Sequence, residues 1–239
     1  MIAALLALAV VAHVPTVRMD DEHGRPSTVG ASTGFDDALL PVTVGYATGL
    51  RPWQRPLTLG ATLTMPMLRP DFGDLRGSVY AELDVNRELG WMVRVAHGWS
   101  VIGTRNDAFS AVGMAARGGV TVGWSARRFA IGGELVAGLT AFTHVHTTTW
   151  GREIGGLPFT RATFGAPAWS LETGLRAGVL LGRVELALRA GFDRKGRLNL
   201  AIPPVYATLG VAVRWGADEW RDAVARGRAK RHGDGRAPQ

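Results

Sequence analysis

Apolar and polar residues alternate with a period of two along most of the chain between Leu40 and Trp215. From Leu57 to Met67, for example, the odd positions are all apolar, whereas the even positions are Thr, Gly or Pro. Successive side chains of a β-strand point to opposite faces, so each such segment predicts a strand with one apolar and one polar face. The pattern predicts ten strands, over residues 40–50, 57–67, 76–85, 91–101, 108–117, 119–126, 129–142, 168–181, 183–192 and 204–215.

Most of these segments are about 9 to 12 residues long, which suits a tilted strand that crosses a bilayer better than the average soluble strand of about five or six residues. The face opposite the apolar one carries charged residues such as Arg94, Glu185 and Arg189. The prediction is therefore an all-β fold with a single closed antiparallel transmembrane β-barrel of about ten strands, with eight or twelve as alternatives. In such a barrel the apolar residues meet lipid and the charged residues turn inward.

Three hairpins predict a register that keeps like faces together. A turn at Arg127 and Arg128 pairs Trp124 with Ile131 and leaves Thr121 opposite Glu134. A turn at Leu181 and Gly182 pairs Val179 with Val184, and pairing Val85 with Trp91 brings Glu82 opposite Arg94. The long connection from Phe142 to Pro167 and the next longest, from Asp193 to Pro203, then lie on the same side of the membrane, as expected for outer loops.

The regions outside the alternating pattern complete the predicted organisation. Residues 1–12 are apolar and end in small or short side chains, as in a signal peptide, although no Lys or Arg precedes them. Residues 13–39 are polar and predict a flexible leader, residues 40–215 form the barrel, and residues 216–239 form a periplasmic tail with a basic end. No stretch reaches the roughly 18 to 20 apolar residues of a membrane-spanning helix, so a membrane location requires a barrel or an anchor.

Composition narrows the possible chemistry. The chain contains no Cys, which excludes disulfides, thiolate metal sites and Cys nucleophiles. Its 32 glycines suit a tightly packed sheet. The net charge of +7 comes from scattered arginines and not from one basic segment, so we expect no nucleic-acid partner.

The segment from Leu40 to Trp215 resembles the small outer-membrane barrels of the OmpA and OmpW type. The resemblance rests on the alternation, on aromatic residues near strand ends and on a final strand with Leu209, Val211, Val213 and Trp215, which is similar to the terminal signal read by the barrel-assembly machinery. It implies the outer membrane of a Gram-negative bacterium as location, with outer-membrane lipid and that machinery as partners. The aromatic residues expected at the two membrane interfaces are Trp53, Trp91, Phe129, Trp169, Phe192 and Trp215.

The polar faces of the strands predict a mixed set of charges inside the barrel, where the groups neutralise one another and fill a narrow lumen. A small polar conduit is the alternative. The residues expected to face the lumen are Tyr80, Glu82, Asp84, Arg94, Glu134, Glu172, Arg176, Glu185, Arg189 and Arg214.

His144 and His146 lie two residues apart and would face the same side of a strand. His146 and Thr148 weakly resemble the His and Ser of lipid A deacylases, but Thr replaces the nucleophile, so exposure on the stem of an outer loop is the preferred interpretation. No metal or cofactor is expected. The predicted function is a non-enzymatic barrel, structural or a channel for a small solute, whose long outer loop contacts a solute or extracellular ligand. The alternatives are a lipid-modifying barrel enzyme and a secreted lipocalin-like barrel, in which the apolar faces would point inward.

Overall fold

The computed structural model of the chain describes residues 26–35, 41–52, 55–66, 75–85, 90–105, 107–126, 128–156, 158–165, 169–195 and 204–216. The predicted signal peptide at 1–12, almost all of the predicted tail at 216–239, and Trp53 lie outside these residues. Within them, no helix is long and apolar enough to cross a membrane.

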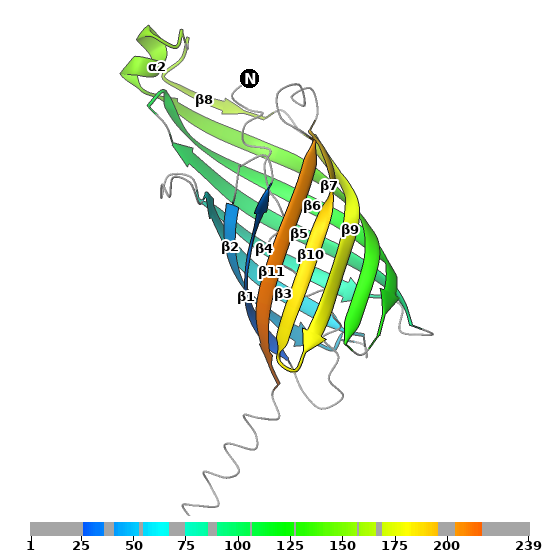
Figure 1. Cartoon of the computed structure of the whole chain (residues 1–239). Coiled ribbons are helices and arrows are strands. Elements are labelled where there is room, and N and C mark those ends of the chain that lie inside the picture. Colours follow the sequence, from blue (N-terminus) through cyan, green and yellow to red (C-terminus); the bar gives the residue numbers. More distant parts are fainter. Residues whose placement is uncertain are drawn as a thin grey trace, which may run out of the picture.

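The described strands form one closed antiparallel barrel (Figure 1). Ten strands make the ring, in the order β1-β2-β3-β4-β5-β6-β7-β9-β10-β11, and β1 pairs with β11 to close it. An additional short strand, β8, pairs only with the far end of β7. The bounds are β1 Ser27–Phe35, β2 Pro41–Leu50, β3 Leu57–Pro66, β4 Arg76–Asp84, β5 Trp91–Arg105, β6 Phe109–Ser125, β7 Phe129–Thr147, α2 Thr149–Glu153, β8 Arg161–Phe164, β9 Trp169–Leu181, β10 Val184–Lys195 and β11 Val205–Trp215.

Burial in this barrel is the reverse of burial in a soluble protein. Large apolar side chains lie on its outer surface, including Leu135, Leu175 and Val211, which are 53%, 63% and 46% exposed. Charged side chains are buried inside, including Glu185 at 0% and Arg94 at 4%. The predicted orientation of the two faces is therefore found, and the lipocalin-like alternative is wrong because it requires an apolar interior.

The predicted fold class, a closed ten-stranded antiparallel barrel, is confirmed, but two strand assignments are wrong. Residues 27–35, predicted as part of a flexible leader, form β1, which pairs with β2 on one side and β11 on the other. Residues 108–117 and 119–126, predicted as two strands, form the single strand β6. The total of ten was correct because one missed strand compensated for one strand counted twice.

The hairpin predictions have mixed outcomes. The register at the turn after β6 is confirmed, with Trp124 opposite Ile131 and Thr121 opposite Glu134. The other two registers are wrong by two residues. Val184 pairs with Leu181 and not with Val179. Arg94 pairs with Asp84 and not with Glu82. A shift of two residues leaves every side chain on its predicted face, which is why the face assignments survive the error.

The connections divide cleanly between the two ends of the barrel. The short connections 51–56, 85–90, 126–128 and 182–183 lie at the end where β1 begins and β11 finishes, which we call the short-turn end. The connections 36–40, 67–75, 106–108, 148–168 and 196–204 join strands at the opposite end, which therefore has the three longest connections as well as two short ones. β3 ends and β4 begins at this opposite end, whereas the predicted strand order placed the link between them at the periplasmic end, because that order lacked β1; the residues around Asp71 themselves lie outside the described part of the chain.

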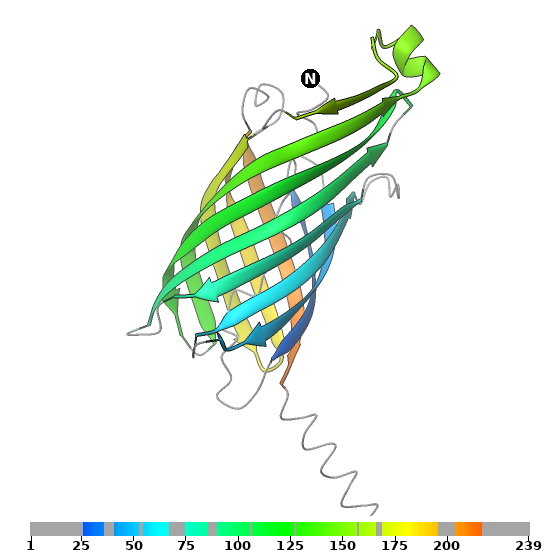
Figure 2. The ribbon, with the colours of Figure 1, turned by 180° about the vertical axis from the view of Figure 1, so that it is seen from behind.

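At the end opposite the short turns, β5, β6 and β7 extend beyond the rest of the barrel and carry α2 and β8 (Figures 1 and 2). We call this extension, residues 102–112 and 140–164, the flap. β7 is paired with β9 only as far as Leu139 and then with β8. The inner side of the flap has its own small apolar cluster, in which Ile102, Phe109 and Val145 pack with Phe159 and Phe164 among others. The described part of the predicted loop from Phe142 to Pro167 thus continues β7 to Thr147 and adds α2 and β8 as a folded extension of the sheet.

Candidate functional site: a charged lumen and an extended flap

Strands from opposite walls of the barrel place a carboxylate between two arginines. Glu82 on β4 contacts Arg94 on the neighbouring strand β5, with Nη1 3.3 Å from Oε1. It also contacts Arg176 on β9, with Nη1 2.8 Å from Oε2. In the ten-stranded ring, β5, β6 and β7 separate β4 from β9 on the shorter way round. The Glu82–Arg176 bridge therefore spans the lumen.

A second group of charges joins β9 to four further strands, which are β6, β7, β10 and β11. Arg189 on β10 contacts Glu134 on β7 through Nε and Glu172 on β9 through Nη2, the latter at 2.9 Å. Arg117 on β6 lies 2.8 Å from the other oxygen of Glu172. The Tyr206 hydroxyl donates a hydrogen bond of 2.8 Å to Glu134, and the Arg189 guanidinium lies over the Tyr206 ring. These contacts fill the part of the lumen bounded by β6, β7 and β9–β11.

The remaining predicted lumen residues lie on the same inner surface. Glu185 and Arg214 form an ion pair of 2.7 Å between β10 and β11. Asp84 is buried opposite Arg94 in the register of β4 and β5. Tyr80 lies against Gly60 of β3, where a Cβ atom would overlap the Tyr ring. A cavity of about 70 Å³, lined by Tyr80 and other lumen residues, remains between the two charge clusters and has room for a few water molecules.

The structure thus places all ten predicted lumen residues on the inner surface, and it adds members that the prediction omitted. Arg117 and Tyr206 both join the ion-pair network. Arg117 could have been found by reading 109–125 as one strand, because it is in phase with the inward-facing Thr121. Among the described strands, the inward-facing arginines equal the inward-facing carboxylates in number. They are Arg76, Arg94, Arg117, Arg176, Arg189 and Arg214 against Glu82, Asp84, Glu134, Glu172, Glu185 and Asp193.

The predicted aromatic residues lie on the outer surface near strand ends. Trp91 and Phe129 begin β5 and β7 at the short-turn end, and Trp215 ends β11 there. Trp169 and Phe192 lie at the opposite end, at the start of β9 and near the end of β10, and both are exposed. The outer surface therefore carries aromatic side chains at both ends of its apolar band.

The structure places His144 and His146 on the outer face of the flap. β7 contains a β-bulge, since Ala115 pairs with Thr140 while Met114 pairs with Phe142, leaving Ala141 as an extra residue. The extra residue reverses the alternation, so the even-numbered positions, which face inward up to Thr140, face outward at the two histidines. His144 Nδ1 lies 2.9 Å from the hydroxyl of Thr163 on β8.

The Thr148 hydroxyl makes its hydrogen bonds to backbone groups and not to these histidines. Thr148 is the N-cap of α2, and its hydroxyl accepts a hydrogen bond of 3.1 Å from the Gly151 amide and donates to the backbone carbonyls of Asp107 and Ala108. A hydroxyl engaged on both sides by backbone groups fixes the loop conformation. In the part of the chain described, no three His, Asp or Glu side chains are grouped so that they could hold a metal ion.

The fold and its surfaces define a closed antiparallel barrel with an apolar exterior and a charged interior. No family model and no curated protein matches the chain. Among solved structures, the chain is similar to the transport unit of the autotransporter AIDA-I from Escherichia coli, with 11% identity over 80% of this chain and 88% of the other, at a TM-score of 0.26. It is also similar to Acinetobacter baumannii OccAB2, with 9% identity over 85% of this chain and 99% of the other, at a TM-score of 0.22.

Proposed function

We propose that this chain is a non-enzymatic outer-membrane barrel that anchors its flap at the cell surface and whose lumen is closed by ion pairs. The observation that carries the proposal is the reversed burial of the two faces. Soluble monomers rarely expose a continuous apolar patch of more than a few hundred Å². Here apolar residues cover the outside of every barrel strand, including Val79, Val120 and Leu188, which are 56%, 42% and 52% exposed.

The height of the apolar band on the outer surface matches the thickness of a lipid bilayer and so supports a membrane location. On β7 the outward side chains are apolar or Gly from Phe129 to Phe142, and polar residues begin at His144. At about 3.3 Å per residue and a strand tilt of about 40 to 45°, this run covers roughly 30 Å along the membrane normal, close to the thickness of a hydrocarbon core. The location, the processing of residues 1–12 and recognition of β11 by the barrel-assembly machinery are part of the proposal.

The inside of the barrel supports a structural role over that of an open channel. The Glu82–Arg176 bridge crosses the lumen, and the network around Arg189 occupies the neighbouring volume. A lumen filled by paired side chains leaves no continuous path for a solute. The lipid-modifying alternative has no support in the site, because Thr148 is committed to capping α2.

Two measurements test the proposal. The protein should fractionate with the outer membrane and migrate on a cold detergent gel as a compact band that shifts on heating, because a closed barrel resists detergent. Reconstituted in a planar bilayer, it should show no stepwise ion conductance. Recovery of the folded protein in buffer without detergent would refute the membrane location, and steady single-channel currents would refute the closed lumen and favour the small-solute channel.

A further inference from the structure

The outer face of the flap carries a row of polar and basic side chains that runs across four strands. The registers place Arg105 of β5 opposite Ser110 of β6, Ser110 opposite His146 of β7, and His146 opposite Arg161 of β8. All these side chains except the half-buried Ser110 are exposed. Adjacent strands are about 4.8 Å apart, so the row spans about 14 Å from one arginine to the other. We call these four residues the basic row.

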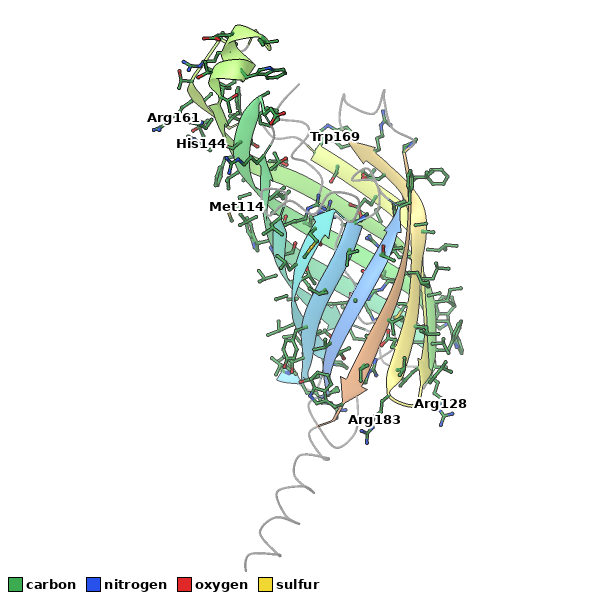
Figure 3. The ribbon with its side chains drawn as sticks, turned by 60° about the vertical axis from the view of Figure 1, so that its left-hand side comes forward. Met114, Arg128, His144, Arg161, Trp169 and Arg183 are labelled. Atoms are coloured by element: carbon green, nitrogen blue, oxygen red, sulfur yellow. The ribbon has the colours of Figure 1, made fainter. Side chains whose placement is uncertain are left out.

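The basic row begins where the apolar band ends. The next row toward the barrel contains the exposed Val112, with His144 beside it, and the row after that contains Met114 opposite Phe142. Figure 3 shows Arg161, His144 and Met114 in this order along one side of the flap, from its tip toward the barrel. A ligand lying on this face would therefore meet apolar side chains with one part and basic ones with another.

From this arrangement we propose that the basic row binds the phosphate group of a lipid in the outer leaflet, with the acyl chains of that lipid against Val112, Met114 and Phe142. The inference rests on the proposed membrane location. Guanidinium groups bind phosphate oxygens through paired, charge-assisted hydrogen bonds, and Ser hydroxyl groups and His rings supply further donors. His144 lies at the boundary with its Nδ1 engaged by Thr163, and its Nε2 donates to a phosphate when Nδ1 accepts the Thr163 hydroxyl proton.

The row is also positioned for this ligand by the fold and not by a mobile loop. Its strands are held by the continuous β5–β6–β7–β8 pairing, and the inner side of the flap is fixed by the Phe109–Val145 cluster. The bulge at Ala141 turns both histidines outward. A free phosphate ion would use the basic groups alone, whereas an amphiphile would also cover the apolar strip beside them.

The experiment compares two double variants in the folded protein, each with two arginines removed. Arg105→Ser with Arg161→Ser removes both arginines of the basic row. Arg128→Ser with Arg183→Ser removes two arginines from the short-turn end, at the opposite end of the barrel (Figure 3). Each protein is placed in phosphatidylcholine nanodiscs, and binding of bisphosphorylated lipid A is measured by native mass spectrometry, with lipid A lacking its phosphates and inorganic phosphate as competitors.

We expect the basic-row variant to bind the phosphorylated lipid at least about tenfold more weakly than wild type, and the short-turn variant to bind within about twofold. The dephosphorylated lipid should compete poorly. Equal loss in both variants, or equal binding of the dephosphorylated lipid, would overturn the proposal, and full competition by inorganic phosphate would show a free-phosphate site instead. Heat-shifted gel mobility of the same nanodiscs reports insertion, so a failure of membrane location is seen separately from a failure of lipid binding.

Discussion

Replacing Glu82 by Gln removes one buried charge while keeping the shape of the side chain. The Glu82 carboxylate neutralises both Arg94, at 3.3 Å, and Arg176, at 2.8 Å, and all three side chains are less than a tenth exposed. Removing one member of a buried ion pair costs about 3 to 5 kcal/mol, because the partner charge stays buried without compensation. We expect about 3 kcal/mol, the low end, because Asp84 lies opposite Arg94 and still offsets part of its charge.

The assay is equilibrium unfolding by urea of the barrel folded into lipid vesicles, followed by Trp fluorescence. A loss of 3 kcal/mol corresponds to a factor of about 150 in the unfolding equilibrium constant, well above the error of extrapolation. The double variant Glu82→Leu, Arg176→Met removes the ion pair that spans the lumen and leaves Arg94 opposite Asp84, so it should lose less than about 1.5 kcal/mol. Arg183→Gln at the exposed turn is the matched control, expected within about 0.5 kcal/mol of wild type. A Glu82→Gln variant as stable as this control, or a double variant as unstable as the single one, would refute the reasoning.

Three further predictions concern the strands and the flap. Gly123→Ala should destabilise the barrel because its Cβ would overlap the backbone carbonyl of Ile131, whereas Gly133→Ala, whose Cβ meets nothing nearer than 4.0 Å, should unfold at the same urea concentration as wild type. Leu135→Arg, on the outer face, should lower the free energy of unfolding in vesicles by about 2 to 4 kcal/mol, as for other charges placed near the bilayer midplane, and a loss under about 0.5 kcal/mol would contradict a lipid-facing position. Thr148→Val should remove the cap of α2, cost about 1 kcal/mol locally and speed proteolysis of the flap while leaving the lipid A of the cell unchanged; an altered lipid A profile would support the enzyme alternative instead.

The orientation of the strands could be predicted from sequence because it depends on a local property, the alternation of apolar and polar residues. Within the apolar band, charges such as Arg94 and Arg189 occur only in one phase of that alternation, and lipid selects the other phase. An error of two residues in a hairpin register leaves this phase intact. The inner position of the charged residues was therefore accessible without any knowledge of strand pairing.

The strand boundaries depend on pairing between distant segments and were less predictable. β1 has the sequence STVGASTGF, whose outward positions mix the apolar Val29 with polar residues such as Thr33, and its strand conformation comes from pairing with β2 and β11. In β6 the pair Gly118 and Gly119 suggests a break, but their backbones continue the ladder opposite His97 and Val136. The bulge at Ala141 interrupts the period of two, so the end of β7 was predicted as a loop.

The absence of Cys allows the central claim, that the apolar face meets lipid, to be measured directly with single introduced cysteines. Spin labels would be attached at Leu135→Cys and Val211→Cys on the outer face and at Thr121→Cys in the lumen, with the protein in lipid vesicles. We expect the labels at 135 and 211 to relax strongly with oxygen, which dissolves in hydrocarbon, and weakly with a water-soluble nickel complex. Labels at 135 and 211 that are more accessible to the nickel complex than to oxygen would show that water covers the apolar face, and would contradict the account.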